Sequence, residues 1–456
     1  MLSTQQWREL GEKLNADPED PWALFPHESE EGRRCAAAAV RLTRSEYKAN
    51  PAINVPVDFK RSHRGAESTQ QAFGRFFLDV LREAPDVADR VVTVSADVAS
   101  STNLGGWINR IGIWNPEDRP DWFAESAETL LHWRESKRGQ HIELGIAEVN
   151  LVGLLSELGL TWSRDGQPLF PIGSIYDPFV GRALEPWSFG MYAGGQSILV
   201  GTPSGITLAP EGGAHQSVIT PSIGIEQPQC VAWEPAFSQD LEWTLLSAFS
   251  RLGQSGGTSS YFRLSTRPID QELAGVPVDP SERENRRRCV LSGGYRLRTA
   301  VQHLPDVTLV GTGVVMTELM AASLELEQFD LACDVICLTS ADLIFRAFQA
   351  RQGLAVGDDS ILSTLFPVDR AGPIVSVLDG HPHTLSFLAG INATPIACLG
   401  VDDFGQSGDI DALYSHFGID IPTIVGAALD LVDAKTNVPV YKRPAKNVSS
   451  GVNKYS

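Results

Sequence analysis

Apolar runs and amphipathic stretches alternate along the chain from residue 70 onward, and this alternation predicts an α/β fold. Residues 70–84 have the spacing of a helix that buries one face, and residues 90–97 form a short apolar run typical of a buried strand. Further strand-like runs lie at 168–177, 197–202 and 259–266, and a helical pattern lies at 240–253. Apolar strands that alternate with helices belong to mostly parallel sheets covered on both faces.

A second unit of the same kind follows a polar stretch at residues 270–288. Its strand-like runs are 306–313, 331–340, 372–380 and 394–405, and its helical patterns are 314–329 and 421–432. The sequence therefore predicts two consecutive α/β domains with mostly parallel sheets. The expected bounds are a helical and linker segment at 1–66, domains at 67–272 and 286–438, and a flexible tail at 439–456.

The helix expected at residues 149–160 is apolar nearly all round, which is typical of a helix in the protein interior. It opens with Glu148, and Gly145 lies just before it. An acid in the first helical turn is favoured by the helix dipole, which is the structural explanation. A carboxyl group that enters an apolar helix is also a candidate proton donor. The residues alone leave both explanations open.

Composition excludes several classes of partner. The 456 residues carry a net charge of -19, which disfavours nucleic acid and anionic membranes. The one dense basic run, 283–289, is expected to be a solvated face of a linker. Six cysteines without CxxC pairs favour reduced thiols in a cytoplasmic protein. No apolar run approaches the roughly 18 residues that a membrane span needs, so we expect no membrane partner.

Two loops carry polar side chains suited to a small-molecule site. The stretch SADVASSTNL follows the strand at 90–97, and open α/β sheets form sites outside the carboxyl ends of their strands. Asp97 is well placed for such a site, although a turn or a helix cap explains it equally well. In APEGGAHQSVITP, Glu211 and His215 flank two glycines that permit close backbone approach to a ligand.

Two further patterns have ordinary structural explanations. The aromatic residues Phe170, Tyr176 and Phe179 follow a strand, and core packing accounts for them. The GTG at 311–313 opens a helix, as a phosphate-binding loop does. However, Met316 stands where GxGxxG needs its third glycine, and no Walker lysine follows. A tight strand-to-helix turn is therefore the better interpretation.

Taken together, these stretches resemble the thiamine diphosphate enzymes of the transketolase type. GIAE at 145–148 resembles their G-[IV]-x-E motif, SADVASSTN at 95–103 is similar to SADLTxSN, and EGGAHQ at 211–216 resembles GEDGPTHQ. Over residues 70–435 the chain is most similar to the homodimeric-type pyruvate dehydrogenase decarboxylase component. The region 398–420, CLGVDDFGQSGDIDALYSHFGID, resembles the end of that protein.

The resemblance implies catalytic roles for Glu148 and His215. In that family the matching glutamate hydrogen-bonds a ring nitrogen of the aminopyrimidine, and the thiazolium serves as an electron sink. The cofactor contacts implied in this way are Glu148, Phe179, Tyr176 and Asp97. The implied substrate contacts are His215, Glu211, Arg267 and Ser101.

One departure from the family pattern concerns the diphosphate. The GDG motif that binds Mg²⁺ and the diphosphate is absent, so the chain resembles the C-terminal two-thirds of these enzymes. The resemblance implies either that a separate subunit carries GDG or that the chain is a truncated product. It also implies that this chain holds no metal and is inactive alone. A homodimer or a heterotetramer is the expected assembly, with a lipoyl acyltransferase as a further partner.

Two chemistries remain open, with a third, non-catalytic alternative. The C-terminal region implies oxidative decarboxylation of a 2-oxo acid such as pyruvate, with acyl transfer to a lipoyl carrier. RLSTRPIDQ at 263–271 instead resembles the SRQ stretch of transketolases, whose arginine, here Arg267, holds a sugar phosphate. An arginine also binds a carboxylate. Ser101 could hold phosphate, but no second arginine is obvious, so we favour the 2-oxo acid. A non-catalytic assembly subunit with the same fold is the third hypothesis.

Overall fold

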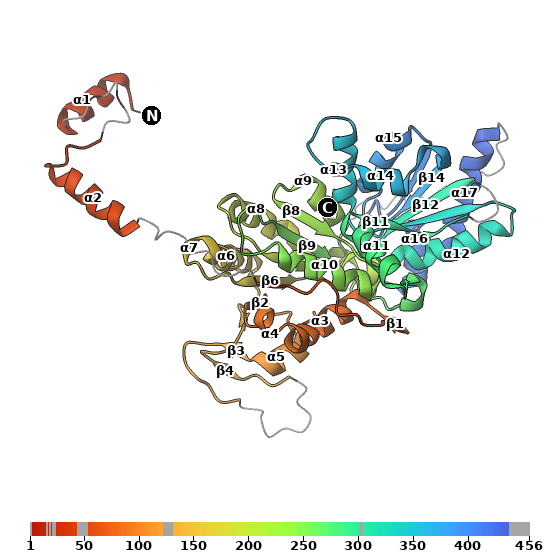
Figure 1. Cartoon of the computed structure of the whole chain (residues 1–456), viewed down its shortest axis with the longest axis horizontal. Helices are drawn as coiled ribbons and strands as arrows, with labels where there is room; N and C mark the ends of the chain where they lie inside the picture. Colours follow the sequence, from red (N-terminus) through yellow and green to blue (C-terminus); the bar gives the residue numbers. More distant parts are fainter. Residues whose placement is uncertain are drawn as a thin grey trace, which may run out of the picture. The chain divides into compact units, whose positions relative to one another are not determined.

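The computed structural model describes residues 2–14, 17, 20, 24–42, 53–121, 131–300 and 304–436. The chain divides into two compact units, Met1–Asn50 and Pro51–Ser456. The described part of the first unit contains α1 (Thr4–Leu14) and α2 (Glu30–Leu42), both of which expose apolar side chains such as Trp7 and Val40 (Figure 1).

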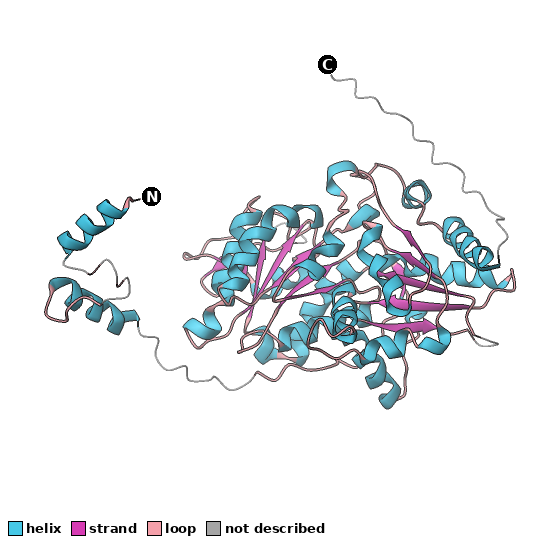
Figure 2. Ribbon diagram, turned by 90° about the horizontal axis from the view of Figure 1, so that it is seen from above, coloured by secondary structure: helices cyan, strands magenta, loops and turns pink. Residues whose placement is uncertain are grey.

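The second unit contains two larger β-sheets, and their strands lie between helices (Figure 2). The first sheet has the strand order β4-β3-β5-β2-β6-β7-β9-β8, and all of its pairings are parallel. Its strands are β2 (Val91–Ser95), β3 (Ile113–Trp114), β4 (Glu135–Ser136), β5 (His141–Glu143), β6 (Phe170–Ile175), β7 (Ile198–Gly201), β8 (Cys230–Trp233) and β9 (Ser259–Arg263). Every residue of β6, β7 and β9 is buried, as strands covered on both faces require.

Helices cover both faces of this sheet. One face packs against α3 (Thr69–Glu83), α5 (Gly105–Ile111) and α10 (Ser238–Ser250), with α4 (Pro85–Ala88) beside them. The other face packs against α6 (Glu148–Gly159) and α8 (Val180–Tyr192), with α7 (Thr161–Arg164) and α9 (Ile223–Glu226) at the edges. Helix α3 begins with a capping box, because Ser68 and Gln71 satisfy each other's backbone amides.

Helix α6 is less enclosed than its composition predicts. Leu151, Val152 and Leu155 are buried in the core, but Val149 is 49% exposed and Gly153 faces open space. The sequence therefore predicted the helix correctly but was wrong to place it wholly inside this chain.

The second sheet has the order β11-β13-β12-β14-β15, parallel except for β11. Its strands are β11 (Gly294–Arg298), β12 (Val307–Thr312), β13 (Cys333–Leu338), β14 (Ile374–Val377) and β15 (Ile396–Leu399). The surrounding helices are α11 (Pro280–Leu291), α12 (Met316–Glu327), α13 (Ala341–Arg351), α14 (Ser360–Leu365), α15 (Ala389–Asn392), α16 (Ile410–Phe417) and α17 (Ile421–Thr436). A short antiparallel pair, β1 (Ala66–Glu67) with β10 (Ile269–Asp270), lies beside the two larger sheets.

The predicted fold class, α/β with two mostly parallel sheets, is confirmed. The strands that were not predicted have only two to five residues and lack a long apolar run; they are β1, β3, β4, β5, β8, β10 and β11. The GTG turn is as expected, since Gly313 has φ +65° between β12 and α12. The predicted domain bounds remain a prediction, and the expected tail at 439–456 lies outside the described residues.

The basic run at 283–289 corrects another expectation. It lies on helix α11 rather than in a solvated linker. Arg283 pairs with Asp58, with Nε 2.7 Å from the carboxylate. Arg286 donates to the Ala274 carbonyl and stacks over the Tyr295 ring. Half of the positive charge is therefore used inside the fold.

One apolar stretch is longer than the sequence analysis recognised. Residues Ile410–Asp433, with a mean hydropathy of 1.2, are long and apolar enough to cross a membrane. Gly418, with φ +69°, separates α16 from α17 within this stretch, and Leu413 and Ile424 are buried in the core. The stretch is therefore two helices that are partly buried in the core, and core helices pass the same test of length and composition.

Candidate active site

Most of the predicted site residues meet in one pocket. This pocket has a volume of about 180 Å³ and lies at the carboxyl ends of β2 and β6. Six of the eight predicted residues line it, namely Asp97, Ser101, Glu148, Tyr176, Phe179 and His215. The position agrees with the rule that open parallel sheets form their sites at this edge.

Glu148 is the first residue of α6 and is buried, with 7% of its surface exposed. Its Oε1 lies 3.7 Å from Nη1 of Arg182, a residue of α8 that the sequence analysis missed. The Arg182 guanidinium also lies 4.6 Å from the centroid of the Phe179 ring. The Glu148 carboxylate and the Phe179 ring, which we expect to hold a ligand, are thus both in contact with the long cationic side chain of Arg182.

The rings of Tyr176, Phe179 and His215 form an aromatic wall of the pocket that Glu148 also lines. The rings of Tyr176 and Phe179 stack with centroids 6.3 Å apart and planes inclined by 11°, and the His215 ring meets Phe179 edge-on at 5.7 Å. The Tyr176 hydroxyl donates to Oγ of Ser101 at 3.1 Å. This wall offers a flat apolar face with polar groups at its rim, which suits a heteroaromatic ring.

Asp97 is held in an unusual backbone conformation, with φ +63°. Its amide donates to Oε1 of Glu143 at 2.7 Å. Glu143 in turn faces His141, whose Nδ1 lies 2.9 Å from Oγ1 of Thr93. Burial raises the pKa of Glu143, but hydrogen bonds from His141 and from the Asp97 amide outweigh it, so this pKa lies below its ordinary value. The ionised carboxylate therefore fixes a strained residue at the pocket wall, a common feature of functional sites.

The loop that carries His215 is fastened to the second sheet's side of the molecule. Gly212 has φ +59°, and a Cβ there would lie 2.5 Å from the backbone nitrogen of Ser407. The side-chain amide of Gln216 donates through Nε2 to the Gln406 carbonyl at 3.0 Å. The backbone amide of Gln406 donates to Oε1 of Gln216 at 2.9 Å. Only a glycine permits this close approach at Gly212, whereas Gly213 has open space around it and is explained by its φ of +54°.

A buried charged cluster that was not predicted from the sequence is centred on Asp177, the residue after Tyr176 of the pocket. Asp177 accepts hydrogen bonds from Thr220 Oγ1 at 2.6 Å and from Arg263 Nε at 3.0 Å. It also accepts from the hydroxyls of Ser217 and Tyr261. The sequence offers one indication of this cluster, because Arg263 lies in the apolar strand β9, and a buried charge is stable only with a partner.

The cluster contains more acids than bases. Arg263 also binds Glu234, with Nη1 2.6 Å from Oε1, and donates to the Asp379 carbonyl at 2.7 Å. Burial raises the pKa of Glu234 to about 7, and although Arg263 opposes this, Asp379 and Asp177 add to it. Burial likewise raises the pKa of Asp379 to about 6. One arginine among three carboxyl groups therefore leaves a proton on the cluster in weak acid.

We expect the Glu234→Gln variant to lose part of the pH dependence of stability. The folded-state pKa of Glu234 exceeds its ordinary value of 4.5, so the stability it contributes is complete below pH 4.5 and is lost as pH rises through about 7. Between pH 5.5 and 8 the native chain should lose about 2 kcal/mol of unfolding free energy that the variant keeps. Urea unfolding at both pH values measures this difference. Glu185→Gln, at an exposed glutamate, is the control, and identical pH profiles for Glu234→Gln and the native chain would contradict the expectation.

Two predicted residues do not line the pocket. Arg267 binds Oε1 of Glu318 through Nη2 at 2.7 Å, and its guanidinium lies 4.7 Å from the Tyr414 ring centroid. The guanidinium is thus paired within the fold and lies outside this lining, and its role as a substrate contact stays a prediction. Glu211 is exposed on the His215 loop, where its carbonyl accepts from Ser407 Oγ at 3.4 Å.

The pocket is suited to part of a cofactor only. Its volume is below the roughly 300 Å³ at which pockets begin to hold drug-sized ligands. Within the part of the chain that the structure describes, no lysine or arginine belongs to its lining, and Arg182, which lies beside it, is in contact with Glu148 and Phe179, so the lining itself offers no counter-charge for a diphosphate. Among the described residues, no group of three or more His, Cys, Asp or Glu side chains is placed to hold a metal. The aminopyrimidine part of the cofactor implied by the resemblance fits this pocket, and the diphosphate and Mg²⁺ do not.

Two family profiles match the chain. Residues 59–262 match the pyruvate dehydrogenase E1 component middle domain, and residues 293–420 match the transketolase-like TK C-terminal domain. A similar curated protein is the pyruvate dehydrogenase E1 component of Mycolicibacterium smegmatis, which is 26% identical over 409 residues. That match covers 85% of this chain and 42% of the relative, so this chain spans less than half the relative's length.

Solved structures show the same fold. Transketolase from Campylobacter jejuni superposes with a TM-score of 0.65 at 18% identity, over 94% of this chain and 59% of that enzyme. A split gene transketolase, described as an inactive beta4 tetramer, superposes with a TM-score of 0.54 at 18% identity. The latter match covers 80% of this chain and 98% of that chain, so a separately encoded protein of this extent has been solved.

Proposed function

Since the chain belongs to the transketolase-like thiamine diphosphate enzymes, with the pyruvate dehydrogenase E1 middle domain and the transketolase-like C-terminal domain, we propose that it is one half of a split 2-oxo acid dehydrogenase. A second subunit provides the diphosphate and Mg²⁺ site, and this chain provides the aminopyrimidine site. The observation that carries the proposal is the pocket that joins Glu148, Phe179 and His215, with no lysine or arginine among its described lining residues.

The side chains of this chain fit the aminopyrimidine of thiamine diphosphate. We propose that its ring stacks on Phe179 beside Tyr176 while the Glu148 carboxyl group shares a proton with a ring nitrogen. When bound, the cofactor supplies a reactive carbon and an electron sink for the loss of the carboxylate. His215, at the pocket rim, faces the substrate and can hold or deliver a proton there.

The lining favours the 2-oxo acid over a sugar phosphate. A sugar phosphate needs converging cations, whereas the described lining contains none. Arg182 beside it contacts Glu148 and Phe179, and Arg267 is bound to Glu318. A small 2-oxo acid needs fewer such contacts, so oxidative decarboxylation with acyl transfer to a lipoyl carrier is our proposal. Split transketolase activity is the alternative. A complex that cleaves xylulose 5-phosphate and ignores pyruvate would establish this alternative instead.

Calorimetric titration with thiamine diphosphate and Mg²⁺ tests the half-site directly. The purified chain alone should show no binding, because the diphosphate and the metal account for much of the affinity. The complex recovered with its native partner should bind the cofactor and turn over a 2-oxo acid. Tight binding by the chain alone would contradict the two-subunit proposal, and no binding by the complex would contradict the cofactor assignment.

Arg182 occupies the face of Phe179 on which we expect the aminopyrimidine to stack, so it must move before the ring binds. Its side chain is 56% exposed, and it leaves a cation–π contact and a weak ion pair worth together about 1 kcal/mol. The Arg182→Ala variant of the complex should therefore bind thiamine diphosphate about fivefold more tightly, as calorimetry measures. Arg164→Ala, at an exposed arginine with an acidic partner, is the control. Weaker binding by Arg182→Ala would show that Arg182 contacts the ligand.

A further inference from the structure

A second and much larger cavity, of about 860 Å³, lies between residues 57–64 and the segment 271–284. It shares no lining residue with the active-site pocket. Residues 57–64 lead into β1 and α3, and the segment 271–284 connects the two sheets, so the cavity lies where these connections meet. Pockets of about 300–1,000 Å³ hold cofactor-sized or drug-sized molecules, so this one is large enough for a small ligand.

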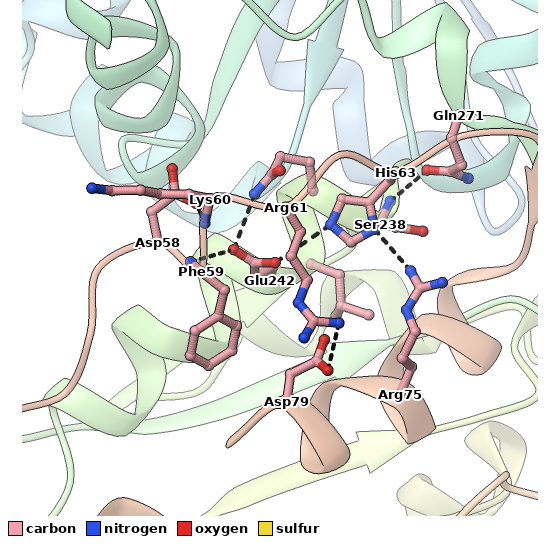
Figure 3. Close-up of polar contacts among 12 residues, drawn as sticks. Asp58, Phe59, Lys60, Arg61, His63, Arg75, Asp79, Ser238, Glu242 and Gln271 are labelled. Atoms are coloured by element: carbon pink, nitrogen blue, oxygen red, sulfur yellow. Dashed lines mark hydrogen bonds and ion pairs between the residues drawn. The ribbon is translucent and has the colours of Figure 1, made fainter. Parts of the chain in front are cut away.

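Two cations of the cavity are free to bind a ligand. Lys60 and Arg64 are exposed, and no hydrogen bond or ion pair within the described part of the chain uses their side chains. Arg61 is different, because its Nη1 lies 2.6 Å from Oδ1 of Asp79. Figure 3 shows Arg61 turned toward Asp79, whereas Lys60 extends away from this contact. In a chain of net charge -19, two uncompensated cations in a concave site create a local positive potential.

The acids of the lining do little to cancel this potential. Asp58 is paired with Arg283, and Glu284 with Arg287, each at 2.7 Å. Glu272 is the one acidic lining residue with no ion pair among the described residues. Two unpaired cations therefore face one unpaired acid, and an anionic ligand is favoured.

Residues 57–64, which carry Lys60 and Arg64, are fixed by contacts with helices α10 and α3. Glu242 accepts the Phe59 amide at 2.9 Å through Oε1, and its Oε2 lies 3.4 Å from Nε2 of His63. Arg75 donates to Nδ1 of His63 at 2.8 Å, so the imidazole, only 8% exposed, is held from both sides (Figure 3). Because the wall is fixed before a ligand arrives, binding costs little ordering of this segment.

Part of the opposite wall is apolar. Val276, Pro277 and Val278 line it, and Val278 is 95% exposed although it lies in a concave region. We propose that this cavity binds a small organic anion with an apolar body, that is, an aryl or acyl carboxylate, phosphate or sulfonate. The cations hold the anionic group, and the valines and proline cover the body. The site is independent of the proposed catalytic function, because it uses none of the same residues.

Fluorescence titration of the full chain with 8-anilinonaphthalene-1-sulfonate tests the site, because this probe combines a sulfonate with an apolar body. We expect saturable binding of one equivalent. The Lys60→Ser/Arg64→Ser double variant should bind the probe about tenfold more weakly, since it loses two charge contacts. Val278→Asp, at an exposed position that folding does not need, should also weaken binding.

Lys137→Ser/Arg138→Ser is the matched control, because it removes two adjacent exposed positive charges from the β4–β5 turn. It should keep the native affinity for the probe. Uncharged N-phenyl-1-naphthylamine should bind equally to the native chain and to the Lys60→Ser/Arg64→Ser variant. The proposal is overturned by non-saturable binding to the native chain, or by equal probe affinity in the native chain and that variant.

Discussion

The Glu148→Gln variant of the assembled complex should turn over its 2-oxo acid about 10³-fold more slowly than the native complex. Glutamine keeps the shape of the side chain at the start of α6 but cannot share a proton with a ring nitrogen, and a positioned proton-transfer group contributes about 10²–10⁴-fold. The contact with Arg182 is long, at 3.7 Å, so its loss should cost little stability. Turnover measures the effect on the reaction rate, and sedimentation shows whether the complex still forms.

The same variant decides between an enzyme and a non-catalytic assembly subunit. Glu157→Gln lies on the same helix at an exposed position, so it controls for any general effect on α6. Full activity of the Glu148→Gln complex would mean that the fold is kept only for assembly. Lost activity in a complex that still forms would exclude that hypothesis, because the assembly surface would be intact.

The long elements of the fold could be predicted from the sequence because buried elements contain long runs or regular patterns of apolar residues. Strand β6 and helix α10 are apolar or buried along most of their length, and both were predicted close to their observed bounds. Strand β5, with only three residues, has no periodicity to detect. Its place in the sheet depends on pairing with β2, which lies about fifty residues away in sequence.

The site could be predicted only where motifs mark it. The motifs around Glu148 and His215 identified two walls of the pocket, and the structure brings them together. Arg182 and Glu143 carry no motif, since their importance arises from what lies beside them in space. Arg267 also lies in a motif, but it does not line the pocket and pairs with Glu318, so its contact with a substrate stays a prediction.

Asp177 explains how the two walls keep their positions. It follows Tyr176 directly on the aromatic turn and accepts hydrogen bonds from Ser217 and Thr220, just beyond His215 in the chain. The same carboxylate binds Arg263 of β9. One buried group therefore joins the aromatic wall to the histidine loop, so that the pocket geometry depends on a residue that does not line it.

We expect the Asp177→Ala variant to lose about 3–5 kcal/mol of unfolding free energy, because buried donors on Thr220, Tyr261 and Arg263 lose their acceptor. Asp177→Asn should lose less, since its carbonyl oxygen still accepts while its amide opposes the other donors. Urea unfolding measures both, with Asp165→Ala, at an exposed acid, as the control. A loss below about 1 kcal/mol for Asp177→Ala would mean that other contacts hold the loop. If the loss is as large as expected, the folded fraction of Asp177→Ala should also show weakened cofactor binding in the complex, because Phe179 and His215 would no longer share a support.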